Sequence, residues 1–215
     1  MSRIEDYALL GDLHSAALVG RDGSIDWMCL PLFDSPACFA ALLDTQDAGR
    51  WLLAPAAGGT CARRRYRADT LVLETEWAVD GGRIRVVDFM VPRHRHPRLV
   101  RIVEGLSGTV EVHGEVKLRF DYGRIMPWVR RRAGRVEAVA GPDAVWLDSS
   151  VQVRGHEWAT VSDFTVRAGD VVSFVLSWAP GHEPAPKILD PQTALLDTVT
   201  FWQSWVARGR LPRCC

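Results

Sequence analysis

Lysine is almost absent from this sequence of 215 residues: Lys117 and Lys187 are its two lysines, and arginine supplies the other basic side chains. The 26 basic residues are balanced by 26 acidic residues, so the formal net charge is zero. A neutral chain does not attract nucleic acid or an anionic membrane through its overall field. We therefore expect neither of these as a partner.

Long apolar runs are also lacking. The longest mostly apolar segment, VVSFVLSWAP at residues 171–180, is far too short for a transmembrane helix, which needs about 20 such residues. The N-terminal segment MSRIEDYALLGDL has early acidic residues and no apolar core of signal-peptide length. These features predict a cytoplasmic protein that is not inserted in a membrane.

Cysteines in a CxxC spacing do not occur. The five cysteines, an odd number, are Cys29, Cys38, Cys61, Cys214 and Cys215. Such a set argues against both a zinc ribbon and a disulfide scaffold, and free thiols are the simpler interpretation. No metal and no other cofactor is expected.

Alternation of apolar and polar residues is the pattern that fills most of the chain. In VEVHGEVKLRF (residues 110–120) the apolar side chains share one face and the charged ones the other, as in a half-buried strand. Turns that contain glycine separate further strand pairs around residues 79–82, 133–134 and 168–170. Short strands at this spacing predict an all-β fold, a large antiparallel β-sandwich over residues 1–180.

The pattern changes in residues 181–215. GHEPAPKILDP is a proline-rich connector, after which Asp190 is a plausible N-cap and Pro191 a first helical residue. One apolar stripe follows at helical spacing, formed by Leu195, Val199, Trp202 and Val206. We expect one C-terminal linker α-helix that lays this stripe against a partner, followed by a divergent tail.

Paired carboxylates are the groups that hydrolyse a glycosidic bond, about 5 Å apart for retention and about 6.5–9.5 Å for inversion. Glu74 and Glu76 point the same way along one predicted strand, about 7 Å apart by strand rise. Alternate acids on a strand are more often its solvated face, which is the interpretation we favour. Asp26 and Asp34 are better candidates for ligand contact, although Asp34-Ser35-Pro36 first predicts a turn capped by the Asp34 side chain.

Histidines and tryptophans offer weaker signals. His94 and His96 lie among arginines without a nearby third ligand, so a solvated loop is favoured over a metal site. Four tryptophans on strand patterns are expected in the core: Trp27, Trp77, Trp146 and Trp178. Trp51 and Trp128 have arginines beside them and are predicted to lie nearer the surface.

Several blocks of the sequence match a known family. IEDYALLGDLHSAALVGRDGSIDWMCLPLFDSPACFAALLD, followed by GRWLLAP, resembles the start of bacterial glycoside hydrolase family 15 proteins, the glucoamylase and trehalase-like group. The match continues in order through RYRADTLVLETEW, LVRIVEGLSGTVEV, LRFDYGRIMPW, GPDAVWL and FTVRAGDVVSFVLSW. The likeness covers about residues 3–206.

This resemblance implies the family's N-terminal trehalase-like domain, a supersandwich-like β-sandwich joined by a linker helix to an (α/α)₆ barrel. The family hydrolyses α-glucosidic bonds with inversion, using two glutamates of the barrel as general acid and general base. That barrel would begin where this sequence stops, so no catalytic residue is carried over. We expect a non-catalytic domain whose partner is the catalytic barrel.

Two departures from the family pattern bear on this expectation. The sequence ends in RLPRCC, and a natural truncation, a frameshifted gene and a fragment all remain open as explanations. Leu32 stands where the family usually has arginine in a Pro-Arg-Phe-Asp-Ser-Pro run. If that arginine lines the sugar pocket or docks the barrel, this chain lacks one charged contact.

The residues expected to face the barrel or its substrate fall in two groups. The loop candidates are Trp27, Pro31, Phe33, Asp34, Ser35 and Phe39, and the helix candidates are Leu195, Val199, Trp202 and Val206. Two alternatives to the scaffolding role stay open: a stand-alone β-sandwich module that binds carbohydrate, such as a glucoside, or protein, and a truncated gene product without a role.

Overall fold

The computed structural model describes residues 3–209, and within them the predicted all-β fold is confirmed: fifteen strands precede a single α-helix. All strand pairs are antiparallel, and β9 (Arg98–Lys117) folds the sheet into two layers. The divergent tail predicted after the helix, RLPRCC, lies outside the described residues.

The first layer contains the C-terminal half of β9. Its order is β1 (Ala8–Gly11), β2 (Ala16–Val19), β3 (Ser24–Cys29), β5 (Arg50–Pro55), β9, β14 (Ala159–Arg167) and β13 (Arg154–His156), with β4 (Ala37–Phe39) beside β3. Two short 3₁₀ helices, Ile4–Asp6 and Gln46–Ala48, lie in its connections.

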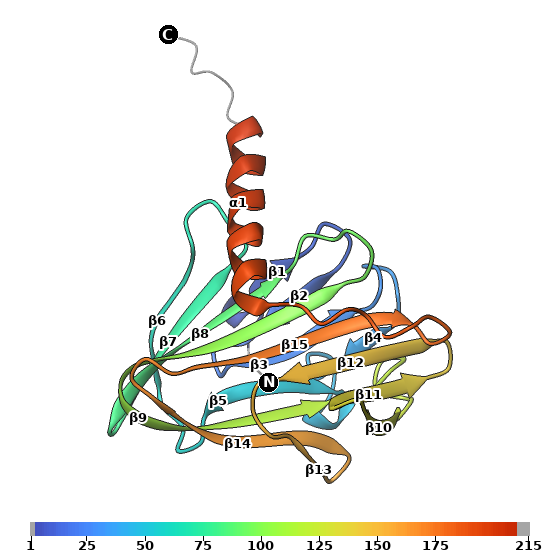
Figure 1. The fold of residues 1–215 in the computed structure, drawn as a ribbon, viewed down its shortest axis with the longest axis horizontal. Helices are drawn as coiled ribbons and strands as arrows, with labels where there is room; N and C mark the ends of the chain where they lie inside the picture. The colour runs from blue at the N-terminus through green and yellow to red at the C-terminus, as the bar shows by residue number, and fades with distance from the viewer. Residues whose placement is uncertain (1–2, 210–215) are drawn as a thin grey trace.

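The second layer contains the N-terminal half of β9. Its order is β6 (Thr60–Tyr66), β7 (Leu73–Val79), β8 (Gly82–Met90), β9, β15 (Val171–Pro180), β12 (Asp143–Ser149), β11 (Arg135–Ala140) and β10 (Trp128–Arg132). Figure 1 shows the long strands β8, β9, β12 and β15 running side by side across the molecule.

The main core lies between the two layers. It joins side chains such as Leu53 and Val112 from the first layer to Leu99 and Leu176 from the second. The alternation predicted for residues 110–120 is confirmed, because its apolar residues are buried. The turns predicted at residues 79–82, 133–134 and 168–170 are also present, each with a glycine at positive φ.

The tryptophans follow the prediction in part. Trp77 and Trp146 are buried and Trp128 is 71% exposed, as expected, whereas Trp27 and Trp178 are only half-buried against the edges of hydrophobic clusters. The prediction for Trp51 is wrong, since only 1% of this residue is exposed. Arg50, its neighbour in β5, points to the opposite face and pairs there with Glu115, so a charged neighbour says nothing about Trp51 itself.

Helix α1 (Pro191–Gly209) begins as predicted, with the Thr193 amide donating to Asp190 Oδ1 at 2.8 Å. Its first two turns pack on the outer face of the second layer, where Leu195 joins a small cluster with Val100 and Val175. The rest of the helix projects beyond the sandwich (Figure 1). No helix within residues 3–209 is long and apolar enough to cross a membrane.

Candidate functional site

Four of the six loop candidates lie between β3 and β4, and the other two lie in these strands. Phe33 is 61% exposed and Asp34 is also exposed at the tip of the loop, while Pro31 and Ser35 are half-buried. Phe39 is fully buried in the main core and is unavailable to a partner or ligand. Trp27 is half-buried in a separate cluster, 6.2 Å from the Tyr122 ring.

The turn at the tip differs from the predicted one. Ser35, rather than Asp34, supplies the side chain, because its Oγ accepts a hydrogen bond from the Leu32 amide at 3.0 Å. The Ser35 amide donates in return to the Leu32 carbonyl at 3.2 Å. The Asp34 carboxylate is therefore left facing solvent beside the exposed Leu32 and Phe33 side chains.

Asp12 and His14 fix the β1–β2 loop to the β8–β9 and β3–β4 loops. It is fully buried, its Oδ1 accepts hydrogen bonds from the amides of His14 and Ser15, and its Oδ2 accepts one from Arg93 Nε at 2.9 Å. The Phe33 amide donates to the His14 carbonyl at 2.9 Å. The buried Asp12 carboxylate thus ties the β1–β2 loop to the β8–β9 loop, and the His14 carbonyl ties it to the β3–β4 loop.

The connector between β15 and α1 is tied to the β8–β9 loop. Glu183 accepts from Arg95 at 2.9 Å and lies 3.2 Å from His96 Nε2, and Arg98 donates to the Lys187 carbonyl. Burial is the main cause that lowers the pKa of His96. A cleft of about 680 Å³ separates this loop, the connector and the start of α1.

Aromatic side chains cover the projecting part of α1. Phe201, Trp202 and Trp205 form one cluster with ring centroids 5.3–6.5 Å apart, and Trp205 is 49% exposed. Thr198 Oγ1 and Trp202 Nε1 are buried and have no hydrogen-bond partner within residues 3–209. Buried polar atoms in native proteins almost always have a partner, so these two are exceptions.

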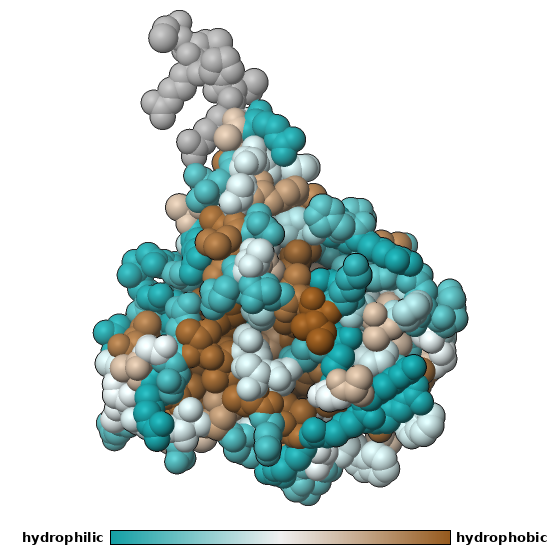
Figure 2. Space-filling view, in the orientation of Figure 1, coloured by the Kyte–Doolittle hydropathy of each residue, from teal (hydrophilic) through white to brown (hydrophobic). Residues whose placement is uncertain are grey.

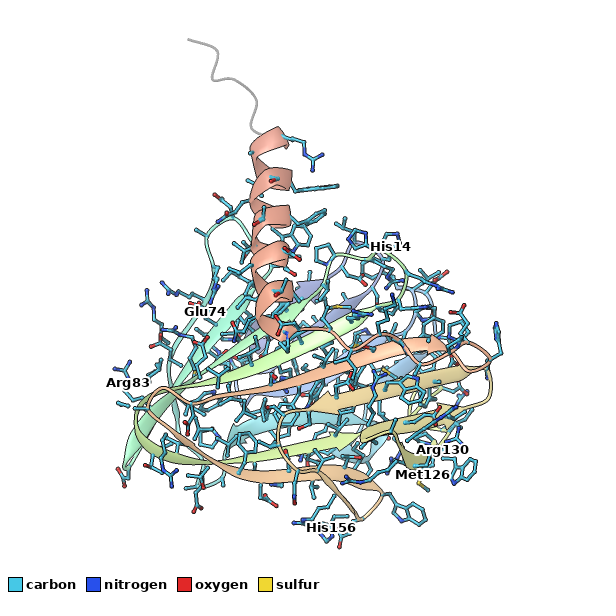
Figure 3. All side chains as sticks on the ribbon, in the orientation of Figure 1. His14, Glu74, Arg83, Met126, Arg130 and His156 are labelled. Carbon is cyan, nitrogen blue, oxygen red and sulfur yellow. The ribbon has the colours of Figure 1, made fainter. Side chains whose placement is uncertain are left out.

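We call the helix-side surface the exposed part of α1 together with the β1–β2, β3–β4 and β8–β9 loops and the connector. Figure 3 shows His14 on the side of the sandwich from which α1 projects. Figure 2 shows apolar residues gathered around the foot of the helix and over the strands beside it. Apolar surface of this extent is typical of an interaction site.

Comparison with known proteins decides the family. The family model for the trehalase-like N-terminal domain matches residues 1–174. The chain belongs to this family. It is 29% identical to a trehalase of Mycobacterium tuberculosis and 31% identical to one of Mycolicibacterium smegmatis, in each case over 97% of its own length.

The chain spans only about a third of the length of these relatives, 34% and 35% respectively. Among solved structures, a bacterial glucoamylase complexed with acarbose matches 93% of this chain with a TM-score of 0.63. That match covers 37% of the glucoamylase at 11% identity, so it supports the fold alone.

Glu74 and Glu76, the acid pair considered from sequence, are not a solvated face and are not arranged as a catalytic pair. Each carboxylate is largely buried beneath two arginines: Arg65 and Arg67 for Glu74, and Arg83 and Arg85 for Glu76. Burial opposes ionisation of Glu74, but the hydrogen bonds from its arginines outweigh it and lower the pKa, and the bond from Arg85 lowers that of Glu76. A general acid needs a raised pKa, so neither residue suits that role.

The other candidate acids and histidines do not form a site either. Asp26 is buried and accepts hydrogen bonds from Ser24 and Tyr7, so it is a structural residue. His94 is exposed in the β8–β9 loop, and His96 faces Glu183 instead of a second histidine. Residues 3–209 contain no group of three or more side chains that could hold a metal ion.

The helix candidates lie on one face of α1, two at its foot and two farther along. Leu195 and Val199 contact the outer face of the sandwich, so their partner is this chain's own second layer. Trp202 is buried and Val206 is half-buried farther along the helix. Phe201 and Trp205 were missed, although aromatic residues at 201, 202 and 205 indicate a stripe wider than a single row.

Proposed function

We propose that this chain is the non-catalytic N-terminal domain of a trehalase- or glucoamylase-like glycoside hydrolase. Its helix-side surface docks a helical catalytic domain, which hydrolyses an α-glucosidic bond with inversion. The observation that carries the proposal is the alignment of 97% of the chain with about a third of two trehalases. The lowered pKa values of Glu74 and Glu76, each paired with arginines, support the absence of hydrolytic activity in this domain.

The helix-side surface supports the docking role through its chemistry. Exposed Phe33 and Trp205 offer apolar contact area, and Trp205 belongs to the aromatic cluster with Phe201 and Trp202. A partner that covers the helix would bury the exposed aromatic rings, and aromatic clusters of this kind are typical interface centres. The loops tied to Asp12 are held in place before docking, which reduces its entropic cost.

The isolated chain is the first test. We expect no release of glucose from trehalose or maltose above background, measured with a coupled glucose assay. Glucose release that disappears in Glu74→Gln or Asp34→Asn would place catalysis in this chain and refute the proposal. Tryptophan fluorescence titrated with the same sugars tests the alternative of a carbohydrate-binding module, and we expect a flat response.

A chimera tests docking directly. This chain replaces the matching third of the Mycolicibacterium smegmatis trehalase, and we expect trehalose hydrolysis to be retained. Trp205→Ala should lower the melting temperature and activity of the chimera, because it removes an interface ring. Trp158→Ala is the matched control, since Trp158 is 79% exposed but lies at the end of the sandwich away from α1. Equal effects of the two variants would contradict docking through the helix.

A further inference from the structure

A second cleft, of about 630 Å³, opens at the end of the sandwich away from the helix-side surface. We call it the end cleft. It lies between the strands β10–β12 of the second layer and the β13–β14 hairpin of the first. Figure 3 shows Met126, Arg130 and His156, three of its lining residues, gathered at that end. Its volume is within the range of small-molecule sites, about 300–1,000 Å³.

The floor of the end cleft is aliphatic. Its deeper lining residues are Val116, Leu118, Val136, Ala138, Val145 and Leu147, all of which belong to the main core. The cleft is therefore continuous with the sandwich interior. A sugar ring placed there would leave its hydroxyl groups without partners, whereas an alkyl chain would lose nothing by leaving water.

The mouth of the end cleft is basic. Four arginines and one histidine line it, against a single acid, Glu157: the basic residues are Arg119, Arg130, Arg131, Arg154 and His156. Arg130 pairs with Glu137, and Arg154 pairs with Asp163. The excess of positive charge favours an anionic group at the mouth.

Arg119 is the most informative of these residues. Only 9% of it is exposed, and its Nη1 donates to the carbonyls of Leu118 at 2.8 Å and Trp158 at 3.2 Å. Within residues 3–209, no carboxylate lies at ion-pair distance from its guanidinium, although buried charges are normally paired. Burial is the main cause that lowers the pKa of Arg119, and the more distant charges of Asp47 and Glu115 oppose it only in part.

Trp158 occupies a position that favours glycine or asparagine. Glu157 and Trp158 form the tight β13–β14 turn with φ values of 45° and 61°. A bulky residue in this conformation is a backbone outlier, and Trp158 is also 79% exposed. Such an outlier points to a function for the side chain, since nothing in the fold requires tryptophan there.

Trp128 extends the same rim from the opposite layer. It is 71% exposed on the edge strand β10, and the Arg130 guanidinium lies 5.4 Å from its ring centre. Two exposed indole rings thus flank an aliphatic floor at the mouth where the arginines gather. Aromatic walls with a few placed polar groups are the usual composition of a small-molecule site.

We propose that the end cleft binds an amphipathic carboxylate with an unbranched alkyl chain. The chain lies on the aliphatic floor between the two indole rings, and the carboxylate pairs with Arg119. This site is separate from the helix-side surface and does not depend on the function proposed for it.

Calorimetric titration of the 215-residue chain with hexanoate, octanoate and decanoate tests the proposal. We expect saturable binding whose affinity rises about fourfold for each added methylene group. Decanol, which has the same chain without the charge, should bind about tenfold more weakly than decanoate. Failure of decanoate to saturate, or equal binding of decanol, overturns the proposal. Saturation by maltose without decanoate binding would instead assign a sugar site and also overturns it.

Three variants at two positions and one control variant locate the ligand. Trp158→Gly relieves the turn and removes the ring, so the protein should remain folded while decanoate affinity falls at least fivefold. Arg119→Met should abolish the preference for decanoate over decanol, and Arg119→Lys should restore part of it. Phe33→Ala removes an exposed aromatic residue on the helix-side surface and should leave decanoate binding unchanged. Decanoate binding that is unaltered in Trp158→Gly refutes the assignment even if the Arg119 variants do not fold.

Discussion

At the residue scale, Arg101 is a charged side chain in the middle of the sandwich. It is fully buried in the second layer, its Nε lies 2.8 Å from Asp88 Oδ1, and its guanidinium lies 5.3 Å from the centre of the Trp51 ring. Its Nη atoms also donate to the carbonyls of Trp51 and Gly23 in the first layer. One guanidinium thus connects the two layers through hydrogen bonds as well as packing.

Arg101→Met should destabilise the protein by about 3–5 kcal/mol, because it leaves Asp88 buried without its counter-ion. The measurement is urea unfolding at 25 °C, followed by tryptophan fluorescence. Arg124→Gln is the control, since Arg124 belongs to an exposed pair with Asp121 and should change stability by less than about 1 kcal/mol. The double variant Asp88→Leu with Arg101→Met should lose less unfolding free energy than the sum of the losses in the Asp88→Leu and Arg101→Met single variants. Strictly additive losses would argue against coupling between the two side chains.

Residue burial was predictable from sequence only where the strand face was known. Alternation placed Val110 and Val112 inside correctly, but Trp51 was assigned from a charged neighbour on the opposite face. Arg101 and Asp88 were not predicted as core residues, because each looks like a solvent-facing residue until its cross-strand partner is known. The same applies to Glu74, whose two arginines come from a neighbouring strand and the segment after it.

At the element scale, α1 is held to the sandwich by its first turns. Leu195 is 4% exposed in the outer cluster of the second layer, whereas the adjacent Leu196 is 67% exposed. The helical period was read correctly from sequence, and so was the N-cap at Asp190. Sequence did not reveal that only the first part of the stripe contacts this chain's own sheet, while the rest lies on the projecting part of the helix. An amphipathic pattern identifies the apolar face but not its partner.

Leu195→Ala should loosen the contact between the foot of α1 and the sandwich. If the helix and the sandwich unfold together, the free energy of unfolding should fall by about 2–5 kcal/mol. Amide hydrogen exchange should show faster exchange in residues 191–209, with a smaller effect on the strands. Leu196→Ala makes the same chemical change one residue away on the exposed face, and we expect a change below about 0.5 kcal/mol. Similar exchange in the two variants would mean that the outer cluster does not anchor the helix.

At the scale of the whole molecule, β9 joins the two layers into one body. Its residues 98–104 pair with β15 in the second layer, and residues 109–116 pair with β14 in the first. Between them lies a bulge, at which Arg83 pairs with Ser107 and Ile84 with Gly105. The crossing is the segment of β9 at this bulge, where the strand passes from the second layer to the first. Side chains that face the main core are odd-numbered before the crossing, as at Leu99, and even-numbered after it, as at Val110. Sequence alternation predicted the second half of the strand within residues 110–120, but the change of parity hid its continuity with residues 98–104.

The crossing of β9 between the layers requires glycine at position 105. A Cβ at Gly105 would lie 1.9 Å from the Arg167 carbonyl oxygen, which belongs to the backbone and has no side-chain freedom to move. Gly105→Ala should therefore force the layers apart and cost at least about 3 kcal/mol, or prevent folding. Gly155→Ala is the matched control, because nothing lies within 4 Å of its added Cβ. Soluble yield and urea unfolding distinguish the two variants. If Gly105→Ala unfolds at the same urea concentration as Gly155→Ala, the close approach at the crossing does not hold the layers in register.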